Sequence, residues 1–345
     1  MRSCTVVVVL SSALALSTFL ACTAGEDLGD DVDDTPAPSG PCDELPAGIT
    51  SGSRGVLDRA QGTPLSRVVL MGGGSEVDRA SSLFVEGANG GDVLVLRASG
   101  STESYTSYFA DELATAPASV TTLLLADRSL ADDAAVLCRV DGAEAIWLAG
   151  GDQSDYLVFW PDALRAAIAR AVSRGVTIGG TSAGAMALSA LAFDAALGGV
   201  TSEEALASPN DDVIHIAASP IAPAALAGAL VDTHFVARDR EGRLLAFLDR
   251  ALVDGAARVL GVGLDESSAL VIDAPTDGAT FTLLSDGGAQ AFAYDVTGPE
   301  DAELGALDLD GVSRIALDDG ATGPWPPSFA SAQALDVVDG VVTLE

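Results

Sequence analysis

The sequence predicts an α/β fold with a mostly parallel central sheet flanked by helices and extra β-strands near the C-terminus. Between residues 66 and 175, short and nearly unbroken apolar runs alternate with longer helix-like segments. Parallel strands have this unbroken apolar character because helices cover both faces of their sheet. After residue 259 the apolar runs are short and separated by turns, as in antiparallel strands and hairpins. With 345 residues, the chain can bury one sizeable core.

The predicted elements follow in order along the chain. The first strands are "SRVVLM", "DVLVL", "VTTLLLA" and "AEAIWLAGG", and the clearest helix is "PDALRAAIARAVSRG" (161–175), which starts with proline and ends with glycine. The strand "VTIGG" follows, and "AGAMALSALAF" (183–193) is expected to run on as a helix. The late strands are "VLGVGL", "SALVID", "ATFTLL" and "QAFAYDV". Residues 47–298 are thus expected to form one domain, with an acidic tail at 299–345 packed on it.

The charged residues exclude several functions. All 17 basic residues are arginine, so a Schiff-base lysine and a phosphate-loop lysine are both ruled out. The net charge of −33 and the pI near 4.1 argue against a nucleic-acid partner, because phosphate binding needs a basic surface. The triple glycine 72–74 lacks the full spacing of a dinucleotide-binding loop and is interpreted as a tight turn. We expect no cofactor and no metal.

The N-terminus carries the features of an export signal. Residues 1–21 are predicted to be a signal peptide, because Arg2 precedes an uncharged apolar run that starts at Thr5. A membrane-spanning anchor is the alternative, although the run is short for one. "FLAC" (19–22) resembles the bacterial lipoprotein box, with Phe19 where leucine is more usual. Lipidation of Cys22 would tether the protein to a membrane without spanning it; cleavage and secretion is the alternative.

An acidic segment follows the signal. Residues 22–46 contain eight acidic residues and no basic one, together with proline and glycine, so they are expected to form a solvated tether. Cys42 in this segment and Cys138 remain after cleavage. Both a disulfide in an oxidising compartment and two free thiols stay open, because sequence separation does not reveal geometry.

"GTSAG" (180–184) lies between a predicted strand and a predicted helix and fits the G-x-S-x-G nucleophile elbow. In such an elbow the hydroxyl of Ser182 projects above the sheet, and the backbone N–H of Ala183 points to a developing oxyanion. The alternative is a glycine-rich turn with a buried serine.

A nucleophilic serine requires a base, and the chain contains two histidines. His215 lies in the strand-like "DDVIHIAASP". His234 lies in "LVDTHFVARDREGRLLAF", with an acid two residues before it and three arginines soon after. Spacing favours His234 only modestly and leaves the orienting acid open.

Four segments, "WLAGGDQSDYL", "GGTSAGAMAL", "DTHFVARDREGRL" and "GVGLDESSALVI", occur in the order and rough spacing of cyanophycinases and the related aspartyl dipeptidases. Over about 66–296 the chain therefore resembles this family of serine peptidases, which have a class I glutamine-amidotransferase-like fold. The resemblance implies that Ser182 is the nucleophile, His234 the general base and Glu266 the acid that orients the histidine. It also makes residues 47–298 a catalytic domain.

The resemblance extends to the substrate pocket. It implies that Gly151 gives a second oxyanion N–H beside Ala183, and that Gln153 lies in the pocket.

Three further arginines, Arg238, Arg240 and Arg243, have the family's spacing after the histidine and are expected to bind substrate carboxylates. Asp232 matches a pocket acid that would receive a substrate guanidinium. Thr233 stands where cyanophycinases usually have glutamine. The alternative for this segment is a solvated helix start with ordinary ion pairs.

The resemblance predicts an exported serine exopeptidase, either a cell-envelope lipoprotein or secreted. It would hydrolyse cyanophycin, a polymer of β-linked Asp-Arg units, to β-Asp-Arg dipeptides through an acyl-enzyme on Ser182. One alternative is a related peptidase acting on aspartyl or isoaspartyl peptides. The other is a non-catalytic, ligand-binding surface lipoprotein. A homodimer is expected because related enzymes are dimers, and contact with a membrane is expected only through the lipid anchor.

Overall fold

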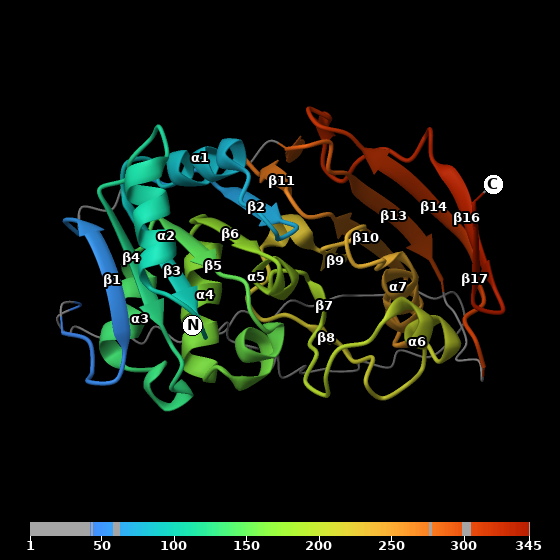
Figure 1. Cartoon of the computed structure of the whole chain (residues 1–345), viewed down its shortest axis with the longest axis horizontal. Helices are drawn as coiled ribbons and strands as arrows, with labels where there is room; N and C mark the ends of the chain where they lie inside the picture. The colour runs from blue at the N-terminus through green and yellow to red at the C-terminus, as the bar shows by residue number, and fades with distance from the viewer. Residues whose placement is uncertain (1–41, 43, 58–62, 276–277, 299–304, 345) are drawn as a thin grey trace, which may run out of the picture. The chain divides into compact units, whose positions relative to one another are not determined.

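The computed structural model of the chain describes residues 42, 44–57, 63–275, 278–298 and 305–344 (Figure 1). The predicted signal peptide at 1–21, the lipidation site at Cys22 and most of the acidic tether lie outside the described residues. Among the residues that are described, no helix has both the length and the apolar character needed to cross a membrane.

The main sheet has nine strands in the order β1-β4-β3-β5-β6-β2-β11-β12-β15. Its centre is parallel, since β4, β3, β5, β6 and β2 run in one direction. At the edges, β1, β11, β12 and β15 each pair with their neighbours in antiparallel fashion. The strands are β1 (Thr50–Gly55), β2 (Arg67–Met71), β3 (Asp92–Arg97), β4 (Ser119–Leu124), β5 (Ala145–Leu148), β6 (Thr177–Thr181), β11 (Ser268–Asp273), β12 (Thr280–Ser285) and β15 (Thr322–Pro324).

Helices cover both faces of the main sheet, and side chains alternate between the two (Figure 1). On one face Val69 packs with Phe84 and Trp147 under α1 and α2. On the other face Leu70 belongs to a cluster that includes residues of α3 and α4. The helices are α1 (Asp78–Gly87), α2 (Glu103–Ser107), α3 (Ala134–Gly142), α4 (Asp162–Ser173), α5 (Ala183–Ala187), α6 (Ser202–Ala207) and α7 (Glu241–Val253), with short 3₁₀ or π turns at Tyr108–Glu112, Arg128–Leu130, Asp155–Phe159 and Ala224–Leu226.

A second sheet of six strands has the order β17-β16-β14-β13-β10-β9. Here β9 and β10 are parallel and the other neighbours are antiparallel. The strands are β9 (Ala229–Thr233), β10 (Arg258–Leu264), β13 (Ala291–Thr297), β14 (Leu309–Leu317), β16 (Gln333–Val338) and β17 (Val341–Leu344). The expected α/β class and the extra C-terminal strands are therefore confirmed, and the segment after 305 joins the fold through strand pairing.

The two sheets share one core. Val231 of β9 and Val262 of β10 lie in the same buried cluster as Leu70 of β2 and Leu148 of β5. The second sheet has a further core of its own, in which α6 and α7 cover it. Strands of both sheets are thus held together because they pack into the same buried cluster.

The predicted helix over 183–193 is too long. The structure ends α5 at Ala187 and begins β7 (Leu191–Phe193), which forms a separate hairpin with β8 (Ile216–Ala218). At the break, the buried hydroxyl of Ser189 accepts the backbone N–H of Val231 at 2.9 Å. Helix propensity in this alanine-rich stretch is overridden by tertiary contacts, as weak propensities commonly are.

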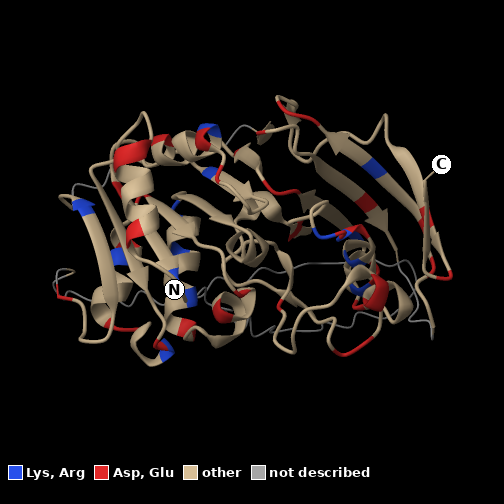
Figure 2. Cartoon of the chain, in the orientation of Figure 1, with Lys and Arg blue, Asp and Glu red and all other residues tan. Residues whose placement is uncertain are grey.

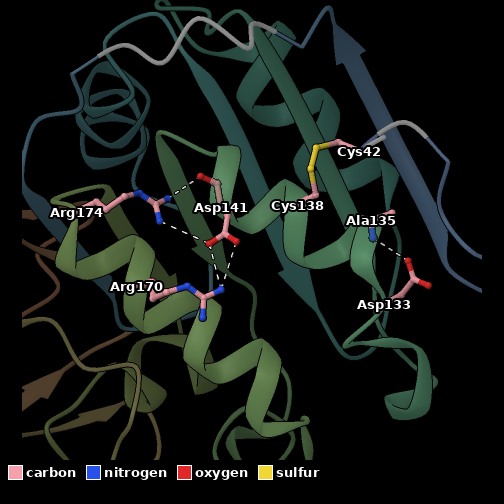
Figure 3. The surroundings of a disulfide bond; sticks show 7 residues. All are labelled: Cys42, Asp133, Ala135, Cys138, Asp141, Arg170 and Arg174. Carbon is pink, nitrogen blue, oxygen red and sulfur yellow. Dashed lines mark hydrogen bonds and ion pairs between the residues drawn. A yellow bond between two sulfur atoms is a disulfide. The ribbon is translucent and has the colours of Figure 1, made fainter. Parts of the chain in front are cut away.

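A disulfide joins Cys42 to Cys138 on α3, with the two Cα atoms 5.4 Å apart (Figure 3). It resolves the alternative that sequence left open. Figure 3 also shows that α3 is fastened to the next helix, because Asp141 pairs with Arg170 at 3.3 Å and its backbone carbonyl accepts Arg174 at 2.8 Å. The end of the N-terminal segment is therefore bonded to a firmly packed part of the domain.

Candidate active site

The predicted site residues come together at the carboxyl ends of strands from both sheets. Ser182 follows β6, Gly151 lies three residues after β5, His234 follows β9, and Glu266 lies between β10 and β11. In open α/β sheets, ligands bind in the crevice outside the carboxyl ends of the strands.

Ser182 occupies a strained turn between β6 and α5. Its φ of 53° and ψ of −122° are unusual for a residue with a side chain. A Cβ added to Gly184 would lie 2.1 Å from the carbonyl oxygen of Leu148, and one on Gly180 would lie 2.6 Å from the carbonyl carbon of Gly184. Only glycine at these positions lets helix and strand approach closely enough to form the elbow.

The serine hydroxyl, an imidazole and a carboxylate form a continuous chain of hydrogen bonds. Ser182 Oγ lies 2.7 Å from Nε2 of His234, and Nδ1 of the same ring lies 2.6 Å from Oε1 of Glu266. His215, the other histidine, pairs instead with Asp194 at 2.6 Å. Geometry thus separates the two histidines that spacing alone barely distinguished.

Backbone carbonyls at the end of β2 and in the triple glycine hold the segments that carry these side chains. The carbonyl oxygen of Met71 accepts the N–H of Ser182 at 3.0 Å, that of Gly72 accepts the N–H of His234 at 2.7 Å, and that of Gly73 accepts the N–H of Ser267 at 2.9 Å. The tight turn expected from sequence is present. Its contacts with His234 and with the residue after Glu266 were missed, because nothing in a short glycine run reveals what packs on it.

The environment of His234 favours a neutral imidazole. Burial lowers the pKa of His234, and the positive charges of Arg238 and Arg240 lower it further, while the hydrogen bond to Glu266 opposes them. A neutral ring with its Nδ1–H donated to Glu266 has a free lone pair on Nε2. That lone pair can accept the hydroxyl proton of Ser182.

Ser182 lines a cavity of about 250 Å³. Gly151 and Ala183, the two expected oxyanion donors, both line it. As the first residue of α5, Ala183 has a backbone N–H without a partner four residues back in the helix. Gln153 also lines the cavity, and its side-chain amide donates to the carbonyl oxygen of Phe193 at 3.3 Å.

The cavity has a cationic wall. Arg238, Arg240 and Arg243 all line it, and Figure 2 shows basic residues gathered where the chain enters α7. Burial, together with the charges of Arg243 and Arg238, lowers the pKa of Arg240 to about 10, although Asp232 acts in the opposite direction. Such crowding of guanidinium groups is relieved by a bound carboxylate, which the planar fork recognises well.

Two of the expected pocket residues lie elsewhere. Asp232 is fully buried, and its oxygens accept Nε and Nη2 of Arg243 at 2.7 and 2.6 Å. The side chain of Thr233 is also buried, and its carbonyl oxygen accepts Arg240 at 2.8 Å. Neither residue lines the cavity. The ion pair instead fixes the position of Arg243, which does line it.

Within the described ranges, no group of three or more histidine, cysteine, aspartate and glutamate side chains has a geometry that could hold a metal ion.

Comparison with known protein families also indicates a peptidase. The family model described as Peptidase family S51 matches residues 91–275. The solved structure of a peptidase from an acI-B1 actinobacterium matches with a TM-score of 0.50 and 18% identity, covering 77% of this chain and 99% of that chain. At this identity the likeness concerns the fold alone. No curated protein matches.

Proposed function

Since the chain belongs to Peptidase family S51, the cyanophycinase and aspartyl dipeptidase family, and is a serine peptidase, we propose that it is an exported exopeptidase that cuts cyanophycin into β-Asp-Arg dipeptides. The observation that carries this proposal is the hydrogen-bonded chain Ser182–His234–Glu266 at a cavity lined by three arginines.

The proposed chemistry uses side-chain and backbone groups of this chain, together with water. Ser182 Oγ attacks the amide carbonyl carbon while Nε2 of His234 accepts the hydroxyl proton, and Glu266 stabilises the imidazolium. The backbone N–H groups of Gly151 and Ala183 bind the oxyanion. As the carbon–nitrogen bond breaks, His234 passes its proton to the leaving amine. Water then attacks the acyl-enzyme, gives its proton to His234 and frees the carboxylic acid, after which the proton returns to Ser182.

The charge of the cavity supports the proposed substrate class. Arg243 is paired with Asp232, so Arg238 and Arg240 are the arginines that can attract a negative group into the cavity. The polyaspartate backbone of cyanophycin ends in a carboxylate. Bidentate guanidinium–carboxylate pairs are both strong and directional. A terminal carboxylate held by Arg238 and Arg240 would place the last unit of the polymer beside Ser182, which supports an exopeptidase.

A second candidate is hydrolysis of short aspartyl or isoaspartyl peptides. It is favoured by the burial of Asp232, whose carboxylate is already bound by Arg243. A substrate guanidinium would then lack the acid that the family resemblance offers, and recognition would depend on carboxylates alone.

Export is part of the proposal. The disulfide between Cys42 and Cys138 supports it, because disulfides persist mainly in oxidising compartments. The predicted signal peptide and lipidated Cys22 would then place the enzyme at a cell envelope, with the acidic residues before Cys42 as a spacer.

The test compares the wild-type domain with Ser182→Ala. Each is incubated with insoluble cyanophycin and with α- and β-linked Asp-Arg peptides, and the products are identified by mass spectrometry. Serine-dependent release of β-Asp-Arg from the polymer is the expected result. Cleavage of the short peptides with an intact polymer would support the second candidate, and no cleavage of any substrate would contradict both.

A further inference from the structure

We propose that His215 is a positioning residue, which holds one wall of the catalytic cavity in place through Asp194 and so strengthens substrate binding. This inference rests on the proposed function, because it concerns how the acidic peptide is held. His215 is the histidine that the catalytic chain of hydrogen bonds does not use.

The wall is the segment from Phe193 to Val200. Phe193, Ala195, Gly198 and Gly199 line the cavity. The middle of the segment has little packing of its own, since Leu197 is 69% exposed and a Cβ on either glycine would meet nothing within 4 Å. Its position therefore depends on how its two ends are fixed.

Asp194 fixes the first end. It is 5% exposed, its Oδ1 accepts the N–H of Ala196 at 3.0 Å, and its Oδ2 accepts Nδ1–H of His215 at 2.6 Å. The backbone N–H of Asp194 also donates to the carbonyl of His215 at 3.3 Å. A buried carboxylate needs such partners, because an unpaired one is costly. His215 is thus the side chain that completes the turn leading into the wall.

Arg243 fixes the second end. Its Nη1 donates to the carbonyl oxygen of Val200 at 3.2 Å, while its other nitrogens bind Asp232. The wall is consequently held at one end by the Asp194–His215 pair and at the other end by Arg243. Loss of either attachment lets the intervening glycines move.

His215 itself takes no part in the catalytic hydrogen-bond chain. Its side chain is 57% exposed, it does not line the cavity, and the partner of Ser182 is His234. Its removal should therefore change substrate binding more than the chemical step. Because the hydrogen bond to the Asp194 carboxylate is charge-assisted but partly exposed, we expect its loss to weaken substrate binding about tenfold.

The kinetic test compares His215→Ala, His215→Asn and Asp212→Ala on an aspartyl peptide. The asparagine amide can donate from the position of Nδ1, and Asp212 is an exposed residue three positions before His215. We expect His215→Ala to raise KM about tenfold, with kcat and the rate of Ser182 labelling by a small fluorophosphonate changed less than about twofold. His215→Asn and Asp212→Ala should keep a KM near that of the wild type.

Amide hydrogen exchange of residues 195–199 provides an arm that needs no substrate. Exchange should be faster in His215→Ala than in the wild type and should return in His215→Asn. If the wild type cuts neither cyanophycin nor an aspartyl peptide, the proposed function fails, and this arm still tests His215. Unchanged KM and unchanged exchange in His215→Ala would overturn the inference, as would an equal fall of kcat and labelling rate.

Discussion

The backbone carbonyl of Gly72 accepts the backbone N–H of His234 at 2.7 Å, so the candidate general base is attached directly to the turn that ends β2. The neighbouring Gly73 lies against the imidazole, where an added Cβ would be 2.4 Å from Cε1. Two strands from different sheets thus meet through backbone atoms beneath the catalytic side chains, and side chains are excluded from that contact.

Gly73→Ala should abolish most activity, because the new methyl group must displace the ring of His234. A displacement of about 1 Å costs on the order of a hundredfold in rate. Gly90→Ala is the matched control, since Gly90 also has a positive φ, 79° against 96°, and its Cβ would meet nothing within 4 Å. Steady-state kinetics on both variants decides the point, and equal losses in the two would contradict the proposed contact.

Ser182→Gly should be inactive yet more stable than Ser182→Ala. Both lack the hydroxyl, but only glycine adopts a φ of 53° and ψ of −122° without strain, which costs about 1–3 kcal/mol in other residues. Urea denaturation of the two variants measures the difference. An alanine variant as stable as the glycine variant would mean that the elbow stores no strain.

The acid limb of the pH profile of kcat/KM should lie below pH 6.5, because the pKa of His234 is lowered from that value and the base must be neutral. Arg238→Gln removes a positive neighbour, so the pKa should rise and activity should be lost at a higher pH than in the wild type. Arg250→Gln, the same change elsewhere, should leave the limb in place. A limb that does not move in Arg238→Gln would argue against this electrostatic coupling.

Asp232→Ala should lower the free energy of unfolding by about 3–5 kcal/mol, because it leaves the buried guanidinium of Arg243 without its partner. The control is Asp254→Ala, which breaks the more exposed pair with Arg250 and should cost less than about 1 kcal/mol. Denaturation curves give both values. If Asp232→Ala is as mild as the control, the Asp232–Arg243 pair does not stabilise the fold as proposed.

Replacing both Cys42 and Cys138 by serine should lower stability by about 4–5 kcal/mol, as expected for a crosslink across 96 residues. The site lies elsewhere in the fold, so kcat should not change at a temperature where the variant is folded. Dithiothreitol should destabilise the wild type and leave the double variant unaffected; a response in the variant would point to another cause.

Much of the fold could be predicted from the sequence. The strands β2 to β6 were located within a few residues because buried parallel strands are written as apolar runs, and the proline and glycine around α4 marked both of its ends. Ser182 was recognisable from its glycine neighbours. The choice of His234 and Glu266 depended on resemblance to a family, since spacing alone did not distinguish His234 from His215.

Other features depend on contacts between distant parts of the chain. Nothing in the local sequence indicates that Asp232 is buried against Arg243, that Asp194 binds His215, or that Gly73 underlies a histidine 161 positions later. The end of α5 was misplaced for the same reason, because Ser189 is held by β9. Contacts between residues far apart in the sequence determine these positions, and the local sequence pattern does not indicate them.

The nucleophile stands on the main sheet, whereas the base follows a strand of the second sheet and its orienting acid lies on the link between the two. The enzyme can therefore be active only while the two sheets keep their alignment, so its turnover rate reports on that alignment. Gentle heating should stop hydrolysis while circular dichroism still reports a folded protein. Fold and catalysis would then fail at different temperatures, with catalysis the more fragile.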